Sequence, residues 1–537
     1  MCKRRWLAAA ALAAVLPTSA MAQGNITAPP LPTNPPAPSP TAASDTGDTL
    51  LGQLPLPPIV FTGFADLAEG YSTNSHAGSG TGGKGDSFSR GRIGFDFDYN
   101  KPRLTANVSY SLTGTYWSKF HRQNHLTNRL NLTSRAVVVP DMLFVTANAF
   151  AAPADLTRAG PLSTSGEPIS RYNSRDTYGY VVRPEFVLSY LDYLKNTLSA
   201  SQGAVFFVRP STDPAAPPPP INPALDSYYT TVTDELASGT YFEQLRFSVV
   251  GSYSQDSQSV RTQRDAQGLA NISYAATRFL KVFGVGGYSD FKSSQPLAKD
   301  LSGPTALGGV TLSNTPEFVL TLEAGTQNNF PTYMGSLRWV ISPLTQLVGN
   351  ATDSITTPQG DMLARLTNMS GYGGGNFGDT GTGLGTGAGG GYSPYDPGGL
   401  ALDNSIYHMR SIQLSLVHTD ERTTYSGGLF GSERDRLDLA PGSRLPRTSV
   451  YGARLAVTQQ IGTDWSAQLS ANYSLGNEFG GHDRVFSGDA RVNYHLTEAI
   501  DLYLSNGYTR RDSRNLLGFS NAPAEEDQII LGINARF

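Results

Sequence analysis

The feature that most constrains this chain is an alternation of apolar and polar side chains from about residue 60 to the last residue. Within residues 104–116, Leu104, Val108 and Leu112 share one phase, and hydroxyl or amide side chains fill the other. A period of two predicts a strand with one apolar and one polar face. Thirteen residues at about 3.3 Å each span roughly 43 Å, which is long for a globular strand and suits a tilted membrane strand.

The connections between the predicted strands alternate in length. Tight turns occur at residues 99–102, 139–141, 313–316, 461–464 and 496–498. Longer polar loops lie between them, at residues 75–85, 117–125, 153–172, 209–224, 292–303, 355–404, 434–445 and 512–524. Short turns at one end and long loops at the other are typical of bacterial outer-membrane barrels.

These patterns agree with what lipid demands of a chain. Inside a bilayer every backbone N–H and C=O must pair within the protein, and a sheet achieves this only by closing on itself. We therefore predict an all-β fold, a large closed antiparallel transmembrane β-barrel of about 22 strands, within a range of 18–22. The strand number is expected to be even, because both chain ends should lie on the periplasmic side. A soluble exported β-protein is the alternative.

The first residues predict export. Lys3, Arg4 and Arg5 precede an apolar run over residues 6–16, and Ala20 and Ala22 are small residues at a cleavage position. Residues 1–22 are therefore predicted to be a secretory signal peptide, because the apolar run is too short to span a bilayer. A membrane anchor is the alternative. Residues 23–58 are proline-rich and predict an extended, disordered linker, which leaves residues 59–537 for the barrel.

Charged residues are placed as a barrel requires. They form only 16% of the chain, and the formal net charge of −4 gives no reason to expect a nucleic-acid partner. A charge on the lipid face near mid-membrane costs about 2–4 kcal/mol, so charges on the polar phase are expected to face the lumen. The lumen candidates are Arg129, Arg135, Glu323, Arg454, Asp489 and Arg491. They line either a transport path or a merely solvated wall. Strand-end tryptophans predict an interfacial girdle: Trp117, Trp339 and Trp465.

The chain ends in an alternating strand that closes on an aromatic residue. Gly532, Ala535 and Phe537 have the spacing of the signal read by the outer-membrane insertion machinery. Location in the outer membrane of a Gram-negative cell is therefore predicted, with membrane lipid and that machinery as partners.

A barrel of this size encloses a wide lumen. Large siderophore-type transporters carry a folded N-terminal plug, but only the proline-rich linker precedes the first predicted strand here, which argues against that class. The glycine-rich segment 355–404 is the candidate constriction. It either folds into the lumen or forms a disordered extracellular loop.

No catalytic, metal or cofactor site is predicted. Two GxGxxG matches lie within the glycine-rich segment without the strand–helix context that a dinucleotide site needs. His121 and His125 are four residues apart but fall in a predicted loop and lack the glutamate of a zinc-protease motif. We therefore expect that the protein is not an enzyme.

Several segments resemble one known family. Residues 70–74 (GYSTN), 130–141 and 287–290 (GYSD), with the strand–turn units up to Phe537, are similar to the PEP-CTERM system-associated outer-membrane proteins. The resemblance covers about residues 60–537 and implies a large barrel associated with exopolysaccharide and cell-envelope systems, without catalytic residues. Two functions are considered: a porin-like conduit or export channel, with polysaccharide as candidate cargo, and a structural or surface-binding barrel with a closed lumen.

Overall fold

The computed structural model describes residues 59–74, 84–155, 174–208, 225–295, 297, 301–315, 317–368, 405–438, 447–478, 481–514 and 524–537. The predicted signal peptide (1–22) and linker (23–58) lie outside the described residues, as does segment 369–404. Among the described residues, no helix is long and apolar enough to cross a membrane.

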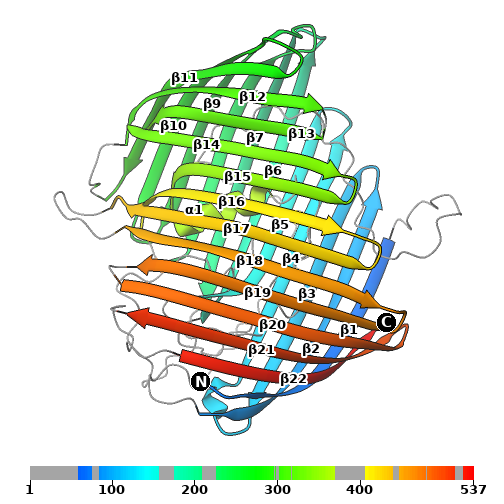
Figure 1. Cartoon of the computed structure of the whole chain (residues 1–537). Coiled ribbons are helices and arrows are strands. Elements are labelled where there is room, and N and C mark those ends of the chain that lie inside the picture. The colour runs from blue at the N-terminus through cyan, green and yellow to red at the C-terminus, as the bar shows by residue number, and fades with distance from the viewer. Residues whose placement is uncertain are drawn as a thin grey trace, which may run out of the picture.

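The described chain is almost entirely β-structure (Figure 1). Its strands are β1 (Ile59–Ser72), β2 (Asp86–Lys101), β3 (Leu104–Trp117), β4 (His125–Val139), β5 (Leu143–Asp155), β6 (Ser174–Tyr190), β7 (Leu194–Val208), β8 (Ser227–Ser238), β9 (Leu245–Gln258), β10 (Thr262–Ala275), β11 (Leu280–Ser293), β12 (Gly303–Thr315), β13 (Phe318–Gln327), β14 (Phe330–Ser342), β15 (Thr345–Thr356), β16 (Tyr407–Thr419), β17 (Thr423–Arg436), β18 (Thr448–Ile461), β19 (Trp465–Glu478), β20 (Gly481–Thr497), β21 (Ile500–Arg514) and β22 (Ala524–Arg536). The helices are the 3-10 turn η1 (His121–Gln123) and α1 (Pro358–Asn368).

The strands close into a single ring. Each strand pairs antiparallel with its neighbours in the chain, and β1 pairs with β22, with Leu67 opposite Ile533. The predicted closed antiparallel barrel of 22 strands is confirmed. Closure pairs both outermost strands, so the ring has no free sheet edge of the kind that lipid would not tolerate.

Connection length separates the two ends of the barrel. At one end, here the turn end, every connection is short, and the longest covers residues 239–244. At the other, the loop end, the connection between β15 and β16 covers residues 357–406. The β13–β14 connection is a tight hairpin at the loop end, where Asn328 and Asn329 have φ of 53° and 62°. Asparagine tolerates this left-handed conformation, which matches the twist of a two-residue hairpin.

The two faces of the sheet differ as the alternation predicts. Leu67, Leu104 and Leu469 are exposed on the outside of the ring. Thr113 and Ser254, on the opposite phase, are buried toward the inside. The apolar core of a soluble domain is replaced by an apolar outer surface and a polar inner wall.

Candidate functional site: the interior wall and its inward helix

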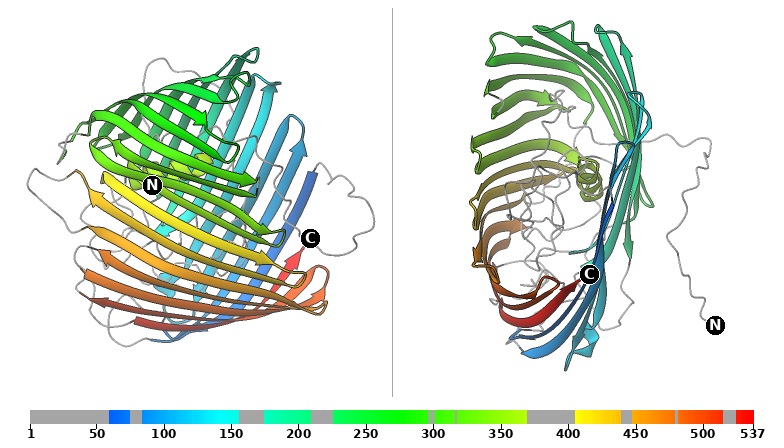
Figure 2. Two further views of the ribbon diagram at one scale, coloured as in Figure 1. Left: turned by 45° about the horizontal axis from the view of Figure 1, so that its top comes forward. Right: turned by 90° about the vertical axis from the view of Figure 1, so that its right-hand side faces the viewer.

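Helix α1 lies inside the barrel, against the wall formed by β5, β6 and β7 (Figure 2). Met362 and Leu363 pack on Val181 and Val205 in one buried apolar cluster. A side chain at Gly203 would have its Cβ 2.6 Å from the carbonyl oxygen of Tyr180 and 3.3 Å from the Leu363 side chain. The described residues at the start of segment 355–404 therefore fold into the lumen, which is the first of the two alternatives considered for this segment.

The N-terminus of α1 is hydrogen-bonded to β9 and to the segment just before β8. Thr357 caps the helix, because its Oγ1 accepts a hydrogen bond from the backbone N–H of Gly360 at 3.0 Å. The same hydroxyl donates to Oδ2 of Asp256 on β9 at 3.3 Å. Gln359 donates from Nε2 to the carbonyl oxygen of Leu225 at 3.3 Å. Polar contacts at its start and apolar contacts on its first turns thus hold α1 in the lumen.

Part of the loop end is closed by packed side chains. Arg261, between β9 and β10, pairs with Asp438, just beyond β17, with 3.4 Å between Nη1 and Oδ2. Arg436 also contacts Asp438, with 2.7 Å between Nε and Oδ1. Since these strands are not neighbours in the ring, the pair bridges the interior. An apolar cluster accompanies it, made of Phe291, Leu301, Ile355, Ile406 and Leu437.

The inner wall changes character from end to end. At the loop end, inner residues such as Thr113, Ser254 and Asp483 are buried. Toward the turn end, Arg135 and Arg246 share the inner face and are exposed. The interior is therefore filled at the loop end and accessible to solvent at the turn end.

All six predicted lumen residues lie on the inner face, but they are spread around the ring rather than gathered into one site. The register places Arg129 beside Ser111, Glu323 beside Met334, Arg454 beside Asn472, Asp489 beside Ser470 and Arg491 beside Gln468. Arg135 lies over the ring of Phe144, with Cζ 4.9 Å from the ring centre.

One inner cluster was not predicted from the sequence. The Tyr503 hydroxyl donates to Asp66 Oδ1 at 3.1 Å and accepts from Arg90 Nη2 at 3.1 Å. Arg491 stacks on the same ring, with Cζ 4.0 Å from its centre, and donates from Nε to Asn493 at 2.7 Å. The phase of Asp66 and Arg90 predicts an inner location, but their meeting with Tyr503 depends on the closure of β1 on β22.

The C-terminal residues contribute to the same closure. Gly532 leaves room for Tyr503, because a Cβ at Gly532 would lie 2.4 Å from the Tyr503 ring. Phe537 exchanges backbone hydrogen bonds with Gly63 at 2.7 and 2.9 Å. Ala535 pairs with Ala65 on β1. The three residues of the predicted insertion signal thus lie along the seam that joins the last strand to the first.

The predicted tryptophan girdle is right for two residues and wrong for the third. Trp339 and Trp465 are 42% and 47% exposed on the outer face near the turn end. Trp117 is 3% exposed and points inward, where it packs on Phe88 with 4.9 Å between ring centres. The reason is its phase: Tyr116 takes the outer position, so the next residue joins Thr115 on the inner face.

Other charged groups form local pairs. Arg447, just before β18 at the loop end, donates from Nε to Asp435 at 2.7 Å and pairs with Glu433. The hydrogen bond that Arg447 donates to Asp435 and the negative charges of both carboxylates raise the pKa of Arg447. His125 contacts the carbonyl oxygen of Gln123 at 2.6 Å. Within the described ranges, no group of three or more His, Cys, Asp or Glu residues is placed to hold a metal ion.

No family model matches the chain, and no curated protein matches it. Among solved structures it is similar to the FrpB iron transporter of Neisseria meningitidis, with 9% identity and a TM-score of 0.39 over 88% of this chain and 82% of that one. It is also similar to the ferric-catecholate import receptor Fiu of E. coli, with 11% identity and a TM-score of 0.42 over 88% and 82% of the two chains. The siderophore receptor PirA of Pseudomonas aeruginosa has 8% identity and a TM-score of 0.35, over 89% and 80%. The assignment of the fold rests on the strand pairing.

Proposed function

We propose that this protein is a barrel of the Gram-negative outer membrane that serves as a passive, porin-like conduit. The observation that carries the proposal is the closed ring with an apolar outer face and a charged inner wall, which is solvent-accessible toward the turn end. The predicted signal peptide and the C-terminal Phe537 support export and insertion.

Helix α1 is the constriction of the proposed conduit. It occupies the lumen through Met362 and Leu363, and its N-terminus is held by Asp256 and the backbone of Leu225. Conduction then requires that the segment carrying α1 leave the wall or that a path remain beside it. The same proposal includes membership of the PEP-CTERM-associated family, a polysaccharide as cargo and the absence of enzymatic activity. The sequence resemblance supports these three points.

A closed, structural barrel is the second candidate. The burial of inner residues at the loop end and the interior pair of Arg261 and Asp438 favour it. In that case the long loops meet matrix polymers or a partner at the cell surface, and no solute crosses.

Planar-bilayer recordings separate the two candidates. The purified full chain and a variant without residues 360–400 are compared, with insertion checked by resistance to carbonate extraction. Discrete conductance steps in the full chain, larger or more frequent after the deletion, support a conduit narrowed by this segment. Silence in both inserted proteins at every voltage excludes the conduit. In that case, loss of surface adhesion in the variant without residues 360–400, with its insertion intact, supports the structural barrel.

A further inference from the structure

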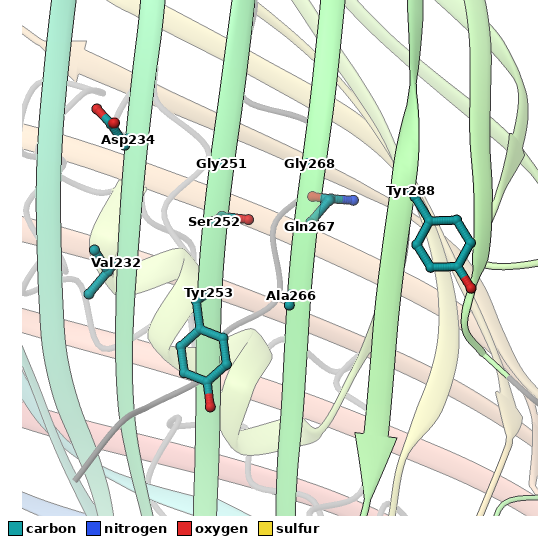
Figure 3. Close-up of a pocket in the computed structure, with 9 residues that line it drawn as sticks. All are labelled: Val232, Asp234, Gly251, Ser252, Tyr253, Ala266, Gln267, Gly268 and Tyr288. Atoms are coloured by element: carbon teal, nitrogen blue, oxygen red, sulfur yellow. The ribbon is translucent and has the colours of Figure 1, made fainter. Parts of the chain in front are cut away.

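The outer face carries a shallow depression over β8, β9, β10 and β11 (Figure 3). Its volume is about 580 Å³, within the range of small-molecule sites. Gly251 and Gly268 form its floor, and Tyr253 and Tyr288 project beside them. Asp234 lies at one end of it.

Missing side chains create the depression. Gly251 and Gly268 are paired across β9 and β10, and a Cβ added to either would meet nothing within 4 Å. Large outward residues stand around them, including Tyr288 on β11 and Val232 on β8. Gly251 and Gly268, with the small outward residues Ala266 and Ala270 beside them on β10, therefore leave a hollow that the surrounding membrane must fill.

Asp234 is an unusual residue for this position. It shares the outer face with Leu198 on β7 and Gly251 on β9, and it lies toward the turn end of β8. In the described strands, no other carboxylate occupies the outer face in the half nearer the turns. Those with an accessible side chain on the outer face lie in the loop half: Glu69, Asp176, Asp290, Glu433, Asp435, Asp512, Glu525 and Asp527.

The carboxylate of Asp234 is held in place but keeps capacity for another donor. Asn196 on β7 donates from Nδ2 to Oδ1 at 2.6 Å. An ionised carboxylate accepts several hydrogen bonds, so one amide leaves further acceptor sites. Asp234 is a fixed negative charge beside a hollow that faces lipid. A positively charged group in the lipid headgroup would therefore stabilise it.

We propose that this depression binds one phospholipid whose headgroup carries a primary ammonium, with the ammonium on Asp234 and an acyl chain over Gly251 and Gly268. The site rests on the proposed membrane placement, in which the turn end faces the periplasmic leaflet. An anionic headgroup binds less well at this site, because Asp234 repels it. A second copy of the chain, which small residues also admit within a membrane, is the competing occupant.

Native mass spectrometry of the full chain in mild detergent tests the site. The protein is mixed with phosphatidylethanolamine or phosphatidylglycerol of identical acyl chains. We expect the amine lipid to be retained over the glycerol lipid by roughly fivefold, the factor for one charge interaction near a membrane surface. Asp234→Asn removes this preference, whereas the matched outward variant Glu69→Gln in the loop half keeps it. Gly268→Leu lowers retention of both lipids by filling the hollow.

Three outcomes would overturn the lipid site. These are equal retention of the two lipids by the unmodified protein, an unchanged preference in Asp234→Asn, or a dimer that Gly268→Leu converts to monomer. Carbonate extraction of the unmodified protein is measured separately. Release without detergent would contradict the membrane placement itself, so the two failures are distinguishable.

Discussion

Arg261 and Asp438 form an ion pair inside the barrel, with 3.4 Å between Nη1 and Oδ2, although 177 residues separate them along the chain. Their side chains are 0% and 3% exposed, so the pair is shielded from solvent and from salt. Because it joins the β9–β10 turn to the end of β17, it holds together two parts of the ring that share no strand pairing.

Breaking this pair should loosen the loop end. Asp438→Asn removes the ion-paired carboxylate of the buried Arg261. Losing one partner of a buried pair typically costs about 3–5 kcal/mol, and we expect the lower end because Arg261 still interacts electrostatically with Asp256. We expect a lower temperature for heat-induced unfolding in detergent. In planar bilayers we expect conductance steps to occur more often. Glu525→Gln is the control, since its partner Arg510 and Glu525 are 56% and 53% exposed, and a surface pair contributes at most about 1 kcal/mol. Equal effects of the two variants would contradict a stabilising role of the buried pair of Arg261 and Asp438.

Replacing Leu363 with aspartate should release α1 from the wall. The side chain is fully buried against Val181 and Val205, and burying a charge there is strongly unfavourable. Because the strand ring itself is unchanged, the barrel should still insert, and protease accessibility of residues 358–368 should rise. Leu363→Met conserves volume and should retain protection. Protection of Leu363→Asp equal to that of the unmodified protein would show that this contact does not hold the helix.

A side chain at Gly532 should disturb the seam between β22 and β1. The new Cβ of Gly532→Ala would lie 2.4 Å from the ring of Tyr503, which Asp66 and Arg90 hold in place. We expect a smaller folded fraction on semi-native gels. The second-site change Tyr503→Ala removes the clash and should restore part of it. No rescue would mean that Gly532 acts through recognition by the insertion machinery rather than through packing.

Brominated lipids should distinguish the three barrel tryptophans. Trp339 and Trp465 lie exposed on the outer face, whereas Trp117 is enclosed by Phe88 and its neighbours. In variants that keep one tryptophan each, bromine on the acyl chains should quench the fluorescence of the first two strongly and that of Trp117 weakly. Strong quenching of Trp117 would place it on the lipid face and reverse the phase of β3.

Much of the architecture could be predicted from local patterns. The alternation around Leu104 and Leu112 fixes which side of a strand meets lipid, and one-sided loop lengths indicate a closed antiparallel ring. The same phase places Glu323 and Arg491 on the inner face. Trp117 lies near a strand end and was therefore predicted to face the membrane interface, which is wrong. Whether a residue faces lipid or lumen depends on its place in the alternation of the strand and not on its distance from the strand end.

The sequence by itself determined the strands, their faces and the two ends of the barrel, because a period of two and the length of a connection are properties of neighbouring residues. Tertiary structure alone decided which distant residues meet: Tyr503 with Asp66, Arg261 with Asp438, Leu363 with Val205, and Gly251 beside Gly268. These contacts depend on register and on closure across the whole ring, and each side chain meets its partner only after every intervening strand has paired.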